Sequence, residues 1–133
     1  MYKKIIAALA MLMLFTPAFS SDLDATKAVL NWLNMVDKSN YGKSWEEASN
    51  VFKKQISKSQ WNVALSNSRD PLGSISNRET SQVFDLNEMP NLPKGQYRVY
   101  IFNTDFENKL GASEVVTVFS KNNKWLVVGY VIN

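Results

Sequence analysis

Two arginines are the side chains best suited by type and spacing to bind a ligand. Arg69 and Arg78 flank the Pro71-Leu72-Gly73 turn, and guanidinium groups hold carboxylates and phosphates through paired hydrogen bonds. One interpretation is therefore a clamp for a small anionic ligand. The alternative, which is common for turn and surface arginines, is structural: Arg69 contacts the end of its own helix and Arg78 pairs with a strand neighbour.

A carboxylate and three phenols offer a second chemistry. Asp37 and Tyr41 lie around the end of a predicted helix, whereas Tyr100 and Tyr130 lie on predicted strands. A buried Asp37 with one of these tyrosines in a pocket would suit general acid-base chemistry, as in a small-molecule isomerase or lyase. The commoner role of such a residue is to organise the turn through side-chain to backbone hydrogen bonds, which Asp37 or Asn40 can do.

The amino acids that are missing narrow the chemistry further. The 133 residues include no His and no Cys, which excludes Ser-His and Cys-His nucleophile pairs, imidazole or thiolate metal sites, and disulfides. The sequence contains no P-loop, dinucleotide fingerprint, nucleophile elbow or Ser-x-x-Lys tetrad. Asp85, Asp105, Glu107 and Glu114 do not form a calcium-loop motif, and we expect them to be solvated charges. No cofactor and no metal are expected.

The first twenty residues have the pattern of an export signal. Lys3 and Lys4 precede an apolar run over 5–15, Pro17 follows, and 18–20 places small residues where a signal peptidase reads them. We expect cleavage after residue 20 and a periplasmic or secreted protein without a stable membrane anchor, because a spanning helix needs about 20 apolar residues. Without the two lysines, 13 basic residues face 12 acidic ones, so the net charge falls from +3 to +1. This balance gives no footprint for nucleic acid.

Residues 21–133 predict a single α+β domain, in which three N-terminal helices pack on a curved four-stranded antiparallel sheet. The expected helices are 22–37, one that begins at Ser44 with Glu47 completing a capping box, and one that begins at Ser57 with Gln60 and ends before Pro71. The expected strands are 76–86, 96–107, 112–120 and 124–132, with 76–86 at an edge and Asn122-Asn123 as a tight turn. Trp32, Trp45 and Trp61 are expected in the core, whereas the place of Trp125 is open.

The central strands are apolar on both faces. Side chains alternate between the two faces of a strand. In the strand 96–107, one face holds Tyr97, Val99 and Ile101 and the other holds Tyr100 and Phe102. In the strand 124–132, one face holds Trp125, Val127 and Val131 and the other holds Leu126, Val128, Tyr130 and Ile132. Helices can cover only one face, and large exposed apolar patches are rare on monomers. We therefore expect the other face to form a homodimer, contact an envelope protein or hold a ligand. The alternative is that the long loop 87–96 covers it.

Many short stretches of the chain also match one protein family. They are Trp32-Leu33, Asp37, 41–45, Phe52-Lys53, Gln60-Trp61, 69–73, Arg78, 93–97, 106–109, 114–117 and 125–130. With these stretches the chain resembles the exported bacterial proteins called domain of unknown function 4019, from about Ala28 to Ile132. The resemblance implies export and supplies no catalytic residues. The order of helices and strands is also similar to the cystatin-like cone of the nuclear-transport-factor-2-like group, which at the level of fold implies a pocket or a dimerising sheet.

The sequence thus predicts a non-enzymatic ligand-binding or interaction module. The candidate ligand-binding residues are Arg69, Arg78, Tyr100 and Tyr130. The alternative, an isomerase or lyase of the cone type, would use an Asp/Tyr pocket.

Overall fold

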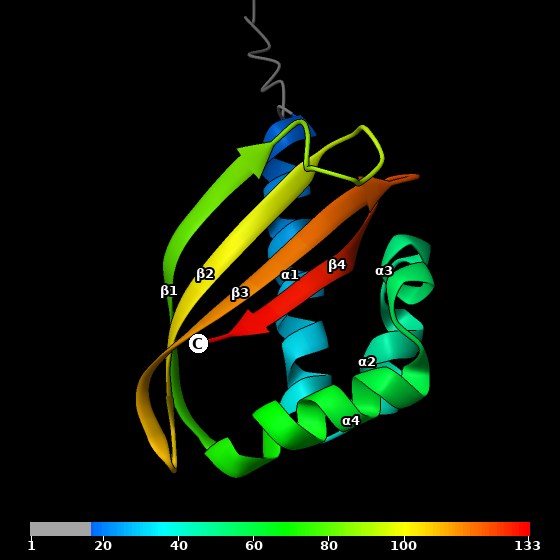
Figure 1. The fold of residues 1–133 in the computed structure, drawn as a ribbon. Helices are drawn as coiled ribbons and strands as arrows, with labels where there is room; N and C mark the ends of the chain where they lie inside the picture. Colours follow the sequence, from blue (N-terminus) through cyan, green and yellow to red (C-terminus); the bar gives the residue numbers. More distant parts are fainter. Residues whose placement is uncertain (1–16) are drawn as a thin grey trace, which may run out of the picture.

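The structure is a computed structural model that describes residues 17–133 (Figure 1). Residues 1–16, most of the predicted export signal, lie outside the described residues. The elements in chain order are α1 (Pro17–Asp37), α2 (Tyr41–Glu47), α3 (Asn50–Gln55), α4 (Lys58–Ser68), the 3₁₀ turn η1 (Asp70–Leu72), β1 (Ile75–Leu86), β2 (Tyr97–Phe106), β3 (Lys109–Lys121) and β4 (Lys124–Ile132). None of the described helices is long and apolar enough to cross a membrane.

The capping box predicted for α4 is confirmed. The Ser57 hydroxyl accepts a hydrogen bond from the Gln60 amide at 3.2 Å, and the Gln60 side chain accepts one from the Ser57 amide at 3.0 Å. These reciprocal bonds satisfy two of the amides that a helix start leaves without partners. Pro71 follows in η1, so the helix ends where the sequence predicts.

The capping box predicted at Ser44 is wrong. The helix α2 begins at Tyr41, and Ser44 is buried inside it, where its hydroxyl donates to the Tyr41 carbonyl at 2.7 Å. The same hydroxyl accepts from the indole of Trp61 at 2.9 Å. The Ser44 hydroxyl, which the local sequence predicts as a helix cap, is therefore used in a tertiary contact instead.

The predicted second helix is also split in two. The Ser49 amide donates to the Val127 carbonyl of β4 at 2.9 Å, which takes the chain out of the helical ladder. The Ser49 hydroxyl then accepts from the Phe52 amide and starts α3. The described residues consequently form four α-helices where three are expected.

The sheet is an antiparallel meander in the order β1-β2-β3-β4, as predicted. The observed strand bounds differ by one to three residues from the expected ones at several ends and agree for β4. Asn122 and Asn123 have φ of 52° and 62°, the left-handed pair that a two-residue hairpin turn requires. The α+β class and the four-stranded antiparallel sheet are thus confirmed.

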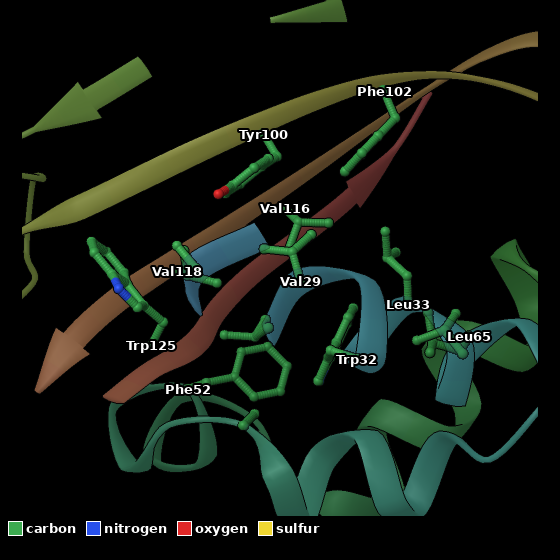
Figure 2. Packing of buried hydrophobic residues seen from close by; sticks show 14 of the residues in the cluster. Val29, Trp32, Leu33, Phe52, Leu65, Tyr100, Phe102, Val116, Val118 and Trp125 are labelled. Carbon is green, nitrogen blue, oxygen red and sulfur yellow. The ribbon is translucent and has the colours of Figure 1, made fainter. Parts of the chain in front are cut away.

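One side of the sheet packs against the helices. Figure 1 shows α1 running behind the strands, α2 and α3 on the side of β4, and α4 across the bottom of the view below the sheet. In Figure 2, side chains of α1 such as Val29 and Leu33 face the Tyr100, Phe102 and Val116 side chains of the sheet. Trp32, Trp61 and Trp125 are buried in this core and Trp45 packs at its margin. The place of Trp125, which sequence left open, is thus in the core.

A bulge in the β3–β4 ladder changes which residues of β4 face the helices. Thr117 pairs with Gly129 but the next residue, Val118, pairs with Val127, so Val128 is the extra residue. Tyr130 joins Val127 on the helix side, whereas Val131 points away and is 52% exposed. The simple alternation expected for this strand is therefore wrong after Val127, because a bulge reverses its phase.

The opposite side of the sheet, called the outer face below, is covered by other described residues only at one end. There Tyr97 and Phe119 stack with ring centroids 4.7 Å apart, and Met89 and Leu92 of the loop 87–96 pack on them. The loop thus does what the alternative proposed, but over one end of the face. Further along, the cross-strand row Ile101, Val115 and Val131 lies half-buried or exposed.

The fit of the loop on the outer face depends on Gly95. Its φ is +154°, and a Cβ placed there would lie 2.5 Å from the Phe119 ring. We expect Gly95→Ala to lower the free energy of unfolding by about 3 kcal/mol, from overpacking and backbone strain together. Gly111→Ala is the matched control, because Gly111 has a φ of +67° and open space around it, which leaves about 1 kcal/mol of strain. Urea unfolding of the two variants measures both, and equal losses would contradict this account of the loop.

Candidate functional site

Arg78 of β1 is the centre of a buried ion network. Its Nη1 and Nη2 donate to the two carboxylate oxygens of Asp37 at 2.8 and 2.9 Å, and its Nε donates to Oε1 of Glu114 at 2.8 Å. Asp37 is the last residue of α1 and Glu114 lies in β3. One side chain therefore ties the longest helix to two strands of the sheet.

Glu114 is completely buried, contrary to the expectation of a solvated charge. Besides Arg78, it accepts hydrogen bonds from the hydroxyl of Thr104 at 2.6 Å and from the phenol of Tyr130. The alternation of side chains along β3 indicates this burial, although residue type alone predicted a solvated charge. Ala112, Glu114, Val116 and Val118 share the helix-facing side of the strand, so Glu114 had to be inside.

The network shifts the pKa values of Arg78 and Tyr130. Burial lowers the pKa of Arg78, but hydrogen bonds to Asp37 and Glu114 outweigh it and hold the pKa above its ordinary value. Burial raises the pKa of Tyr130 well above 10.0, and the neighbouring charge and hydrogen bond of Glu114 raise it further. Arg78 is therefore charged, and Tyr130 is a neutral donor to Glu114.

Arg69, the other candidate arginine, is the C-cap of α4 and is 3% exposed. Its Nη1 donates to the Gly73 carbonyl at 2.5 Å, and its Nη2 lies 3.4 Å from Oδ1 of Asp37. The guanidinium carbon is 4.4 Å from the centre of the Phe106 ring. Its Nε is the one buried side-chain polar atom of the described residues that has no hydrogen-bond partner.

Three of the four predicted site residues thus meet around Asp37 and Glu114. Two guanidinium groups and two carboxylates balance in charge, and Tyr130 joins through Glu114. Arg78 has all three of its nitrogens engaged, so it has no free donor edge for a ligand. The partners of Arg78 lie on α1 and β3, whereas the structural alternative expected a neighbour on the adjacent strand, which is β2.

Tyr100 is the predicted residue that lies apart. Its side chain belongs to the hydrophobic core, and its phenol oxygen lies 3.0 Å from the hydroxyl of Thr26 on α1. It is the register partner of Val116 in β3. Tyr100 therefore does not share a site with Arg69 and Asp37.

A polar recess of about 520 Å³ opens beside Arg69, and we call it the Arg69 recess. It is lined by Asp37, Ser39, Tyr41, Ser66, Arg69, Asp70, Gly73, Ser74 and Glu107. The phenol of Tyr41 donates to Asp70, and the amide of Asn108 donates to the Leu72 carbonyl at 2.9 Å. The β2–β3 hairpin thereby holds the η1 turn in place and forms one wall.

A second polar cluster, which sequence analysis did not identify, surrounds Arg98. Its Nε lies 2.6 Å from Oδ1 of Asp85, its Nη2 lies 2.6 Å from Oδ1 of Asp22, and its guanidinium carbon is 5.2 Å from the centre of the Trp125 ring. Recesses of about 330 and 290 Å³ share these three charged residues, and Tyr100 lines the smaller. The two carboxylates are mostly exposed, so this cluster has the features of a surface ion pair.

The carboxylates do not assemble a metal site. No group of three or more Asp or Glu side chains in residues 22–133 is close enough to hold a cation. Glu107, Asp70 and Asp37 line the same recess from three different elements without converging on one point.

The raised pKa of Tyr130 predicts a loss of stability at alkaline pH. The unfolded chain gives up this proton near pH 10 while the folded chain keeps it, so above about pH 10 the unfolding free energy falls by up to about 1.4 kcal/mol per pH unit. Tyr130→Phe removes this contribution. We expect the variant to be less stable at neutral pH, because Glu114 loses a donor, but to lose less stability on going to about pH 11. Urea unfolding at a series of pH values measures this, and parallel curves for the two proteins would contradict the assignment.

Comparison with known proteins agrees with the family resemblance. A search of curated proteins found no match. The family model described as "Protein of unknown function (DUF4019)" matches residues 28–130. This span includes both arginines, Asp37, Glu114 and every residue of the Arg69 recess. The chain therefore belongs to the DUF4019 family of proteins of unknown function.

Proposed function

We propose that this chain is an exported, non-enzymatic binding module that pairs with a second copy of itself through the outer face of its sheet. The observation that carries the proposal is the row formed by Ile101, Val115 and Val131. These three apolar residues are direct register partners across β2, β3 and β4. They are half-buried or exposed and lie beyond the end that the loop 87–96 covers.

Phe84 of the neighbouring row extends the apolar area, because it is 42% exposed. Its register partner Val99, and Thr117 beside Val99, are themselves buried. Gln82 is the register partner of Ile101 and closes the first row on the β1 side. Neither row contains a charged side chain. Apolar surface of this kind on a sheet face is usually covered in the working form of a protein.

The absence of charge favours a second copy as the occupant. A two-fold interface places the same patch on both sides, so any charge in it would face itself. Apart from the amide of Gln82 and the hydroxyl of Thr117, the side chains of the two rows are apolar, so no like charges would face each other. The loop 87–96 stands over one end of the face and would fix how far the partner can slide.

The geometry gives less support to the alternative, an isomerase or lyase with an Asp/Tyr pocket. Tyr41 lines the Arg69 recess together with Asp37, but its phenol donates to Asp70, and Tyr100 lines a different recess near Arg98. Both oxygens of Asp37 accept hydrogen bonds from Arg78, and Tyr130 is held as a donor to Glu114. A general base needs a free lone pair directed at its substrate, with its acid partner in the same pocket.

Export is supported by the amino-terminal residues, where Lys3 and Lys4 precede the apolar run 5–15 and small residues follow. A chain without cysteine is suited to an oxidising compartment outside the cytoplasm, because the chain has no thiol that could be oxidised there. Expression of the full chain in a bacterial host, followed by the intact mass of the purified protein, reads out processing. Loss of residues 1–20 is expected, and retention of the whole chain would contradict export by cleavage.

The oligomeric state tests the binding proposal. We expect the purified protein to be a dimer by size exclusion with light scattering at micromolar concentration, and Val131→Asp to convert it to a monomer, because a buried unpaired carboxylate is costly. Val63→Asp is the matched control, since Val63 is 58% exposed on α4 and lies away from the outer face. A wild-type monomer, or a dimer that both variants leave intact, would contradict the proposal.

A further inference from the structure

The Arg69 recess has a charge pattern that the proposed pairing of sheets does not use. Asp37 is balanced by Arg78 and Arg69. Asp70 and Glu107 have no ion-pair partner among the described residues, and both are exposed on the rim. The rim is therefore negative, and it favours a ligand that brings a positive group.

Arg69, a buried lining residue of the same recess, supplies a positive group. The Nε and Nη2 atoms form the side-on edge by which a guanidinium binds a carboxylate with two parallel hydrogen bonds. In this chain Nε has no partner, and Nη2 has only the 3.4 Å contact with Asp37. An unsatisfied buried donor is costly, so this edge would gain from an acceptor.

Asp37 can yield the contact without becoming unpaired. Its two oxygens keep the shorter bonds of 2.8 and 2.9 Å from Arg78 when the 3.4 Å contact is lost. Arg69 itself stays anchored, because Nη1 donates to the Gly73 carbonyl and the guanidinium lies on the Phe106 ring. The Nε atom is buried, so a carboxylate reaches the side-on edge when neighbouring side chains move, and the 3.4 Å contact with Asp37 is the longest one to give up.

We infer that the Arg69 recess binds a small zwitterion of the α-amino acid class. Its carboxylate pairs with the Nε and Nη2 edge of Arg69, and its ammonium group lies between Asp70 and Glu107. The recess, at about 520 Å³, has room for such a molecule and for its side chain. The hydroxyls of Ser39, Ser66 and Ser74 on the same walls supply further polar contacts.

The pattern distinguishes this class from simpler ligands. A metal ion needs several converging oxygen ligands, which the carboxylates of the described residues do not provide. A simple anion would meet Arg69 but also the unbalanced Asp70 and Glu107, and a simple amine would leave the Arg69 edge empty. Only a molecule with both charges can pair with Arg69 and also with Asp70 and Glu107.

The test is an NMR titration of the purified protein with glycine, L-serine and L-lysine, and in parallel with acetate and methylammonium. We expect at least one of the three amino acids to give saturable shifts of the amide signals of 69–74 and Glu107. Acetate and methylammonium should each bind with an affinity at least about tenfold lower, since each lacks one charge-assisted pair. Equal binding of acetate or methylammonium, or no saturable shift with any amino acid, would overturn the inference.

Two substitutions locate the ammonium group. Asp70→Asn and Glu107→Gln each keep the shape of the side chain and remove its charge, and each should weaken binding of the amino acid about tenfold. Asp85→Asn, at the Arg98 cluster, is the control and should leave binding unchanged. Undiminished binding in both recess variants would contradict the site. We expect the shifts to be confined to the recess, so the outcome of this test does not depend on the oligomeric state.

Discussion

Burying the Glu114 carboxylate completely requires a positive partner inside the protein, and Arg78 is that partner. The same guanidinium holds Asp37 at the end of α1 with two further bonds. The strand β1, which is otherwise an exposed edge, is thus joined to the helix layer and to β3 by one side chain. Removal of either partner would leave a buried charge uncompensated, so the position of α1 on the sheet depends on this network.

This constraint separates the parts of the molecule that hold the fold from those free to bind. The charges of Arg78, Asp37 and Glu114 are used internally, so the arginine pair is not an open anion clamp. Two other places have groups without a partner, the outer face of the sheet and the Arg69 recess. The row of Ile101, Val115 and Val131 on the outer face lacks a packing partner among residues 17–133, and the Arg69 recess has one unpaired donor edge and two unbalanced carboxylates.

Much of the fold was accessible from local patterns, because apolar periodicity and turn residues act over a few positions. The α4 capping box, the Asn122-Asn123 turn and the meander follow from such patterns. The errors arose where distant contacts prevailed. Ser44 bonds to Trp61 instead of capping a helix, and Ser49 leaves the helix to pair with Val127. The β4 bulge at Val128 reverses the strand phase, and the only local signal for it is Gly129, the next residue, because a glycine inside a strand often marks a bulge. For the site, residue type identified Arg69 and Arg78, but their partners on α1 and β3 depend on tertiary structure.

The most direct test of the account is a double-mutant cycle on Arg78 and Glu114, measured by urea unfolding. Arg78→Met leaves excess negative charge in the network and Glu114→Gln leaves excess positive charge, whereas the double variant keeps the balanced pair of Asp37 and Arg69. We predict that each single substitution costs about 3 kcal/mol or more and that the double variant is more stable than their sum implies by about 2 kcal/mol. Losses that add to within about 0.5 kcal/mol would show that the two charges do not depend on each other, and would contradict the account.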